Sequence, residues 1–190
     1  MTRVLIVVAI LAAGCGSTPP SRFYTLSAVS ASGAAAPVSD LSVAVGPVSV
    51  PASVDRPQIV ITRNANEVSL DELNRWASPL ANNIARVVAA NLVAMLGTPR
   101  VALSPQMLNG AVDYRAAIEV QRFESTPGQA ATLDAVWTVS RDGDGKSRMG
   151  RTTVREAAAD NSYDALAAAH SRAVARMSQD IAEAVRALRQ

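Results

Sequence analysis

A tight-turn sequence between long alternating segments limits how this chain can fold more than any other feature. The turn, Asp-Gly-Asp-Gly at 142–145, lies between the segments 132–141 and 146–156, and a similar segment precedes them at 114–124. Paired Asp and Gly residues suit the backbone of a hairpin turn, and the flanking segments are typical of strands. The sequence therefore predicts a hairpin here, and with it antiparallel pairing in a sheet.

Helical spacing of apolar residues marks two further segments. In 162–188 the apolar positions recur at steps of three and four, while most charged residues fall on other faces. In the earlier segment Asp71 can cap a first turn, DELNRWA, and Pro79 gives a second start signal. This helix is expected either to kink at Pro79 or to consist of two pieces, to carry Trp76 on its apolar side, and to end before Pro99.

The N-terminal half is predicted to contribute shorter strands. The segment 41–50 alternates apolar with small residues, as a half-buried strand does, and Gly46-Pro47 indicates a bulge or bend near a sheet edge. The other predicted strands are 22–28, 58–63 and 67–70, and the predicted loops are 29–40 and 51–57.

The order of these elements is strands, helix, strands, helix, which predicts an α+β fold. We expect a mixed, mostly antiparallel sheet with two main helices packed on one face. Residues 22–190 suit a single domain of ordinary size.

The N-terminus has the pattern of a bacterial secretory signal. Arg3 precedes the apolar run 4–13, which is too short to span a bilayer. Small residues lead from the run to Cys15, as in a lipobox, where a cysteine is acylated and becomes the new N-terminus. One departure is visible, because Ala12 stands where Leu is usual and Leu11 lies one step further out.

This pattern predicts a signal peptide over 1–14, cleavage between Gly14 and Cys15, and a lipidated tether over 15–21. Cys15 would carry N-acyl and S-diacylglycerol groups, which also explains why a secreted chain has one unpaired cysteine. The alternatives are an ordinary signal peptide with a chance cysteine, or a retained anchor helix. Gly16 follows the cysteine where Asp would retain an enterobacterial lipoprotein on the inner membrane, so we expect an outer-membrane location facing the periplasm.

The charge balance argues against a nucleic-acid partner. The chain has 18 Lys and Arg against 16 Asp and Glu, and Arg3 leaves with the signal, so the mature chain is nearly neutral and has no basic block. Apolar residues make up 49% of the chain, which is enough for a core and unlike a disordered composition.

No pattern in the sequence predicts a catalytic or metal site. The sole histidine, His170, falls on the apolar stripe of the last predicted helix, and its neighbour Ser171 points to another face. Spacing typical of zinc ligands is absent. We therefore expect no catalytic residue, no metal, and no cofactor beyond the covalent lipid on Cys15.

Three stretches carry motifs of a known family. Cys15 and the following PPSRFYTL match its lipidated start, with Phe23 in place of the first aromatic residue, and DRPQIV at 55–60 matches its central signature. LDELNRWASPL at 70–80 matches its helix motif, and the residues that coincide are Asn74, Arg75, Trp76, Pro79 and Leu80. In these stretches the chain resembles the PqiC-type auxiliary lipoproteins (paraquat-inducible protein C and relatives), which belong to ABC-linked MCE transport systems.

The resemblance spans nearly the whole mature chain and implies an α+β fold related to the N-terminal domain of TolB. It implies an outer-membrane lipoprotein, not an enzyme, that works with an MCE-domain periplasmic protein and its inner-membrane permease. The implied task is the movement of phospholipid or other hydrophobic molecules between the two membranes. Because members of the family can form rings, a homo-oligomeric ring is a further expectation.

Within these motifs the candidate partner interface consists of Arg56, Pro57, Arg75 and Trp76. A plainer interpretation stands beside it, in which Trp76 belongs to the core and Arg56-Pro57 only fixes a turn. Three hypotheses of function stay open: a subunit that docks the MCE protein, a carrier that holds lipid in its own cavity, and an envelope enzyme. A carrier predicts a large apolar pocket between sheet and helices.

Overall fold

The computed structural model describes residues 19–29, 39–104 and 112–189. The predicted signal peptide over 1–14 and the predicted lipidation site Cys15 lie outside these residues. The described elements, in chain order, are β1 (Arg22–Tyr24), β2 (Val43–Ser49), β3 (Gln58–Asn64), β4 (Glu67–Trp76), α2 (Leu80–Leu96), β5 (Val101–Leu103), β6 (Tyr114–Thr126), β7 (Ala130–Arg141), β8 (Ser147–Ala157) and α3 (Tyr163–Arg189).

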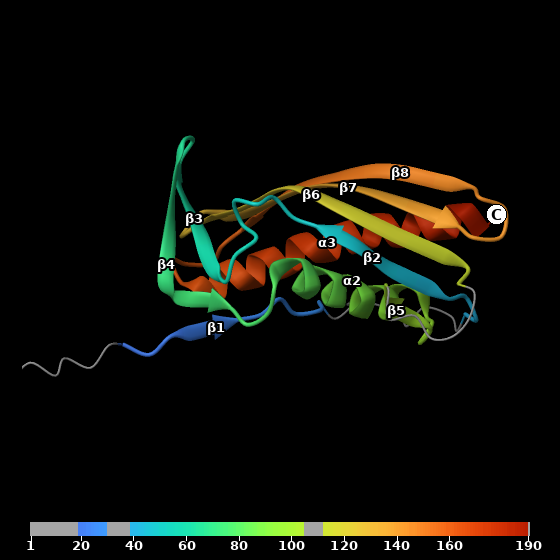
Figure 1. Ribbon diagram of the computed structural model, residues 1–190, viewed down its shortest axis with the longest axis horizontal. Helices are drawn as coiled ribbons and strands as arrows, with labels where there is room; N and C mark the ends of the chain where they lie inside the picture. Colours follow the sequence, from blue (N-terminus) through green and yellow to red (C-terminus); the bar gives the residue numbers. More distant parts are fainter. Residues whose placement is uncertain (1–18, 30–38, 105–111, 190) are drawn as a thin grey trace, which may run out of the picture.

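One mixed, curved sheet and two helices make up the fold, as the sequence predicted. The strand order is β1-β4-β3-β6-β2-β5, and β7 and β8 continue the sheet from the other side of β6. Antiparallel pairing joins β6 to β7 and β7 to β8 over nearly their whole length, whereas β2 runs parallel to β6 and β5. Figure 1 shows α2 and α3 side by side along one face of the sheet, with the β3–β4 hairpin standing steeply at one end.

The long hairpins owe their register to alternating side chains. On β7, Leu133, Ala135, Trp137 and Val139 point into the core, and the residues between them lie on the outer face of the sheet. Opposite Trp137 stands Gly150 of β8, where a Cβ atom would lie 2.2 Å from the indole ring. Glycine is therefore required at this position for the tryptophan to lie across the neighbouring strand.

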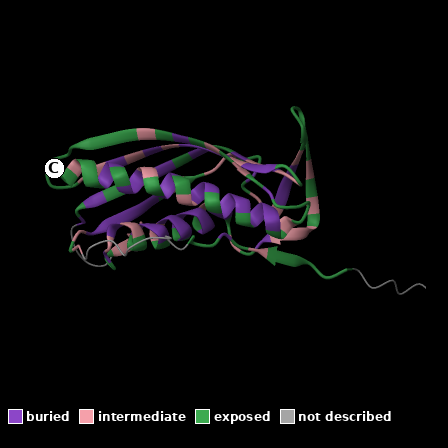
Figure 2. Ribbon diagram, turned by 180° about the vertical axis from the view of Figure 1, so that it is seen from behind, coloured by how far each residue is buried: buried purple, intermediate pink, exposed green. Residues whose placement is uncertain are grey.

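Helix α3 follows the predicted stripe. The Oγ of Ser162 accepts the backbone N–H of Ala165 at 3.1 Å and caps the helix start. Figure 2 shows buried residues running along the face of α3 that meets the sheet, and exposed residues on its other side. His170 is on the buried face with no exposed surface, which confirms its prediction as a core residue.

The extended stretch after β1, which we call the crossing segment (residues 25–29), is held by polar side chains of both helices. The Oδ1 atoms of Asn83 and Asn91 on α2 accept the backbone N–H groups of Leu26 and Val29, each at 3.2 Å. The Oγ of Ser171 on α3 accepts the N–H of residue 27 at 3.1 Å. Buried backbone N–H groups need partners, and here the helices supply them without a sheet.

One prediction is wrong: residues 71–76 of the predicted helical turn 71–77 belong to a strand. The Oδ1 of Asp71 accepts the N–H groups of Leu73 and Asn74 at 2.9 and 3.0 Å, and so it stabilises a bulge within β4 and no helix. β4 then continues to Trp76, and α2 begins only at Leu80. The expected kink at Pro79 and the expected pair of helical pieces are both absent from this part of the chain.

Three smaller results concern strands. The predicted strand 22–28 ends at Tyr24, because the crossing segment bonds to helix side chains. The bulge at Gly46-Pro47 is confirmed by a register shift between Val45 and Val48, and it lies near the edge of the sheet, because among the described residues β5 pairs only with 43–45 of β2. No pattern in the sequence predicts β5, which has three residues.

Asn83 tests the contribution of the crossing segment to stability. Replacing Asn83 by Ala leaves the buried N–H of Leu26 without its acceptor, and an unsatisfied buried donor costs about 1–3 kcal/mol. We expect the free energy of unfolding, measured with urea on the mature chain, to fall by that amount. Asn66→Ala in the exposed β3–β4 turn is the control and should change it by less than about 0.5 kcal/mol. Equal stabilities of the two variants would contradict the assignment.

Candidate functional site

The structure brings the four predicted interface residues together. Arg56 and Pro57 end the loop before β3, and Arg75 and Trp76 end β4. The carbonyl of Pro57 accepts the N–H of Trp76 at 2.7 Å, and Arg75 is the register partner of Gln58. Two motifs about twenty positions apart in the sequence therefore form one site.

Trp76 lies inside this site and not on its surface. Only 6% of the residue is exposed, and its ring meets Phe123 and His170 edge to face, with centroid distances of 6.1 and 6.2 Å. The rings of Phe123 and His170 stack in parallel at 3.8 Å. Trp76 thus anchors the end of β4 to the core, and of the two interpretations of this residue the core interpretation is the correct one.

His170 completes this cluster in its neutral form. Its Nε2 atom lies 2.8 Å from the Oγ of Ser125, and complete burial lowers the pKa of His170 to about 3. Its Nδ1 atom is buried and has no hydrogen-bond partner among the described residues. The cluster is therefore an apolar, uncharged support behind the surface residues.

The surface of the site carries the two arginines. The Nε of Arg75 donates to the carbonyl of Glu72 at 2.9 Å, and its guanidinium pairs with the Glu72 carboxylate at 3.4 Å, so its position is fixed while much of it stays exposed. Arg56 is half-buried: its Nε atom is buried without a partner among the described residues. Pro57 is exposed between them. Arg56, Pro57 and Arg75 are thus the accessible part of the site.

Asp71 links this site to the start of α3. Its Oδ2 atom accepts the hydroxyl of Tyr163 at 2.7 Å. Burial alone would raise the pKa of Asp71, but the hydrogen bonds from Tyr163, Leu73 and Asn74 outweigh it and lower the pKa. Burial and the neighbouring Asp71 carboxylate raise the pKa of Tyr163. Asp71 therefore stays ionised and fixes the corner of β4.

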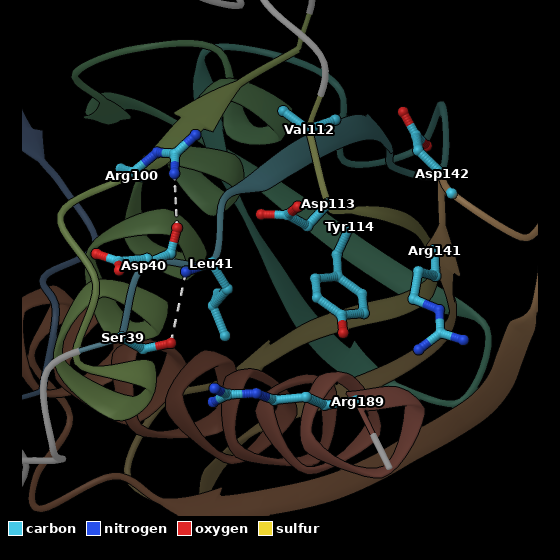
Figure 3. Close-up of a pocket in the computed structure, with 11 residues that line it drawn as sticks. Ser39, Asp40, Leu41, Arg100, Val112, Asp113, Tyr114, Arg141, Asp142 and Arg189 are labelled. Atoms are coloured by element: carbon cyan, nitrogen blue, oxygen red, sulfur yellow. Dashed lines mark hydrogen bonds between the residues drawn. The ribbon is translucent and has the colours of Figure 1, made fainter.

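A large hollow lies elsewhere, where the sheet meets the end of α3, and Figure 3 shows its lining. Its volume is about 730 Å³. Charged side chains in its lining form hydrogen bonds within the protein. The carboxylate of Asp113 accepts the hydroxyl and the N–H of Ser42 at 2.7 and 2.6 Å, and Arg100 donates to the carbonyl of Asp40 at 2.7 Å. Such an ionic lining does not suit an apolar ligand.

The comparisons with known proteins agree with this architecture. A family model described as the ABC-type transport auxiliary lipoprotein component matches residues 24–182. The chain belongs to this family. The fold of this auxiliary lipoprotein is shared by solved structures: a crystal structure of an uncharacterized protein covers 88% of this chain and 99% of its own, with a TM-score of 0.71 at 20% identity.

A second solved structure, a Xanthomonas campestris protein of the DUF330 family, covers 84% of this chain and 92% of its own, with a TM-score of 0.67 at 22% identity. No curated protein matches the sequence. Within the described residues of this auxiliary lipoprotein, neither helix is both long and apolar enough to cross a bilayer. The family is a lipoprotein component of ABC-type transport systems, which is the coarse function that the sequence predicted.

The contribution of the buried Trp76 side chain to stability can be tested by substitution. Trp76→Ala removes a buried aromatic side chain and leaves a cavity, so the free energy of unfolding should fall by about 3–5 kcal/mol. Phe23→Ala on the neighbouring strand removes a ring that is 65% exposed, and it should cost far less. Denaturant unfolding of both variants is the measurement. A larger loss for Phe23→Ala would show that the burial of Trp76 does not stabilise the fold.

The burial of neutral His170 in the cluster predicts how the free energy of unfolding changes with pH. Burial lowers the pKa of His170 in the folded state to about 3, below its unfolded value of about 6.5, so unfolding takes up a proton in this range. The stabilisation is complete above about pH 6.5 and should decline as the pH falls toward 3, by at most about 1.4 kcal/mol per pH unit. Between about pH 6.5 and 5 the carboxylates contribute little. In the variant His170→Phe the free energy of unfolding should not change with pH in this range. A pH dependence that persists in this variant would show that it does not come from His170.

Proposed function

We propose that this chain is a periplasm-facing lipoprotein, anchored in the outer membrane, that docks an MCE-domain protein there. In this proposal it is an accessory subunit of a system that moves phospholipid or other hydrophobic molecules between the membranes. Membership of the auxiliary lipoprotein family, over residues 24–182, is the observation that carries the proposal. The partners are the MCE-domain protein and its inner-membrane permease, and a homo-oligomeric ring is a further expectation.

The proposed anchor is the lipid on Cys15. The lipobox-like sequence and the absence of Asp after the cysteine support lipidation and outer-membrane sorting. The domain follows closely, since only the residues 16–21 separate Cys15 from β1, which begins at Arg22. A chain held in this way keeps its domain at the membrane where the conduit would end.

The proposed docking surface consists of Arg56, Pro57 and Arg75. These residues are accessible, they come from two motifs of the family, and a rigid core cluster lies behind them. Arginine is enriched at protein interfaces because its planar group makes several directed hydrogen bonds while its stem packs. Trp76 acts in this proposal as a positioning residue and makes no contact with the partner.

We also propose that the chain is not an enzyme. Its sole histidine is fully buried and stacked, so it does not reach a substrate as an acid or base. The carrier hypothesis is not proposed, because large buried side chains such as Leu92, Leu133 and Met177 occupy the space between sheet and helices in the described residues. The large hollow at the end of α3 is ionic.

Capture from envelope membranes tests the docking proposal. The lipidated wild-type chain is expected to retain an MCE-domain protein, identified by mass spectrometry. The double variant Arg56→Glu and Arg75→Glu should lose most of it, since like or reversed charges at an interface oppose association. Arg155→Glu, an exposed arginine on β8, is the matched control and should retain the partner.

Two outcomes would contradict the proposal. Failure of the wild-type chain to retain any MCE-domain protein, under conditions that preserve other envelope complexes, would remove the proposed transport role. Equal retention by the double variant and the control would move the interface away from Arg56 and Arg75. Circular dichroism of each variant establishes that the fold is intact.

A further inference from the structure

Three large apolar side chains stay exposed at the end of the molecule where the chain enters the domain. Phe23 on β1 is 65% exposed, and Val68 and Leu70 on β4 are 57% and 42% exposed. Figure 1 shows both strands at this end, where the N-terminal chain leaves the domain. Exposed apolar residues scattered singly need no explanation, but a group at one end does.

The strand register places this group on one face. Phe23 is the register partner of Arg75, and Arg75 is the partner of Gln58 on β3. Val60 lies two residues after Gln58 and therefore on the same side, and its partner on β4 is Leu70. The bulge in β4 reverses the alternation between Leu70 and Arg75 and makes this shared face possible.

The opposite face of these strands meets α3. The ring of Tyr24, next to Phe23 along β1, packs on Tyr163 of α3 with centroids 5.9 Å apart. Asp71, next to Leu70, bonds to the same tyrosine. Since neighbouring residues on a strand point to opposite sides, Phe23 and Leu70 point away from the helix, as does Val68 two residues earlier. We call the exposed surface formed by Phe23, Leu70 and Val68 the outer end face; Val60, on the same side of β3, is itself buried.

The length of the N-terminal chain limits what can lie against this face. Arg22 comes seven residues after Cys15, which is about 25 Å of fully extended chain. Pro19 and Pro20 line a hollow with Tyr24 and Tyr163 on the helix side of β1, so part of that length runs along the domain. If Cys15 is acylated, the tether keeps this end of the molecule within about 25 Å of the membrane surface, and the outer end face is the exposed apolar surface at this end.

We propose that the outer end face rests on the phospholipid bilayer, with Phe23, Leu70 and Val68 as its apolar contacts. This inference rests on the lipidation proposed above. Phe and Leu side chains at a membrane surface reach the boundary between headgroups and acyl chains, where they leave water. The contact holds the domain in one orientation, which a lipid anchor on an extended tether does not do by itself.

The charges around the face fit this role. The exposed carboxylates near these side chains are bonded within the protein: Glu72 to Arg75 and to the side-chain amide of Gln58 at 3.0 Å, and Glu67 to the side-chain amide of Asn64 at 2.8 Å. Arg75 therefore stands at the border between the bilayer contact and the proposed docking surface.

Tryptophan fluorescence of the full, lipidated chain tests the contact. Phe23→Trp and Leu70→Trp are placed in vesicles of phosphatidylethanolamine and phosphatidylglycerol in which some lipids carry brominated acyl chains. The native Trp76 and Trp137 are buried, so their emission in the wild type is the background. We expect bromine to quench the added tryptophans and the bilayer to shift their emission to the blue.

Met149→Trp is the matched control, because Met149 is 71% exposed but lies on β8, away from the tether. Its added emission should be unaffected by bromine. Quenching at 23 and 70 no greater than at 149, in protein that floats with the vesicles, would overturn the bilayer contact and leave the lipidation standing. If the tryptophans at 23 and 70 are protected from an aqueous quencher but are not quenched by bromine, the face is covered by a second copy or by a partner. This result would also overturn the bilayer contact.

A third outcome is that the protein does not float with the vesicles and that its N-terminal peptide lacks the mass of an acyl group. This result would overturn the proposed lipidation, and this inference with it. The flotation and the mass are measured before the fluorescence, so the two failures are distinguishable.

Discussion

Two buried amide side chains on α2 decide how the N-terminal chain joins the rest of the molecule. Asn83 and Asn91 accept backbone N–H groups of the crossing segment, and Asn91 in turn donates to Ser178 on α3 at 3.1 Å. Without these acceptors the crossing segment could not lie against two helices in this way, because the buried N–H of Leu26 would have no partner. The same bonds fix β1 beside β4, and with it the point at which the tether leaves the domain.

The bulge at Asp71 is the second constraint, and it acts on the same end of the molecule. By accepting two backbone N–H groups and one tyrosine hydroxyl, this carboxylate turns β4 through a corner and holds the corner against α3. The end of β4 then reaches Pro57, where Trp76 enters the core. The aromatic cluster of Trp76, Phe123 and His170 thus stabilises a corner that local bonds create.

These two constraints explain which parts of the fold could be predicted. The final helix and the Asp-Gly hairpin follow from local periodicity and turn chemistry, which a sequence displays directly. The stretch 71–77 also displays a local signal, an acidic cap followed by helix-forming residues, but pairing with β1 and the bond to Tyr163 favour the strand. β5 has three residues, too few for a period, and it exists because β2 offers an open parallel edge. For the site, the motifs contain Arg56, Pro57 and Arg75, which the fold brings together and which form the proposed docking surface, whereas the grouping of Phe23 with Leu70 depends on the bulge and could not be foreseen.

The same bulge has a consequence for how the two proposed contacts relate. By reversing the alternation of β4, it moves Leu70 to the face of Phe23 and leaves Arg75 between that face and the loop that ends in Pro57. A regular strand would put Leu70 and Arg75 on opposite sides and would divide the apolar group. A subunit that docks a conduit at a membrane needs its partner surface next to its bilayer surface, and one irregular corner in a short strand is sufficient to place them side by side.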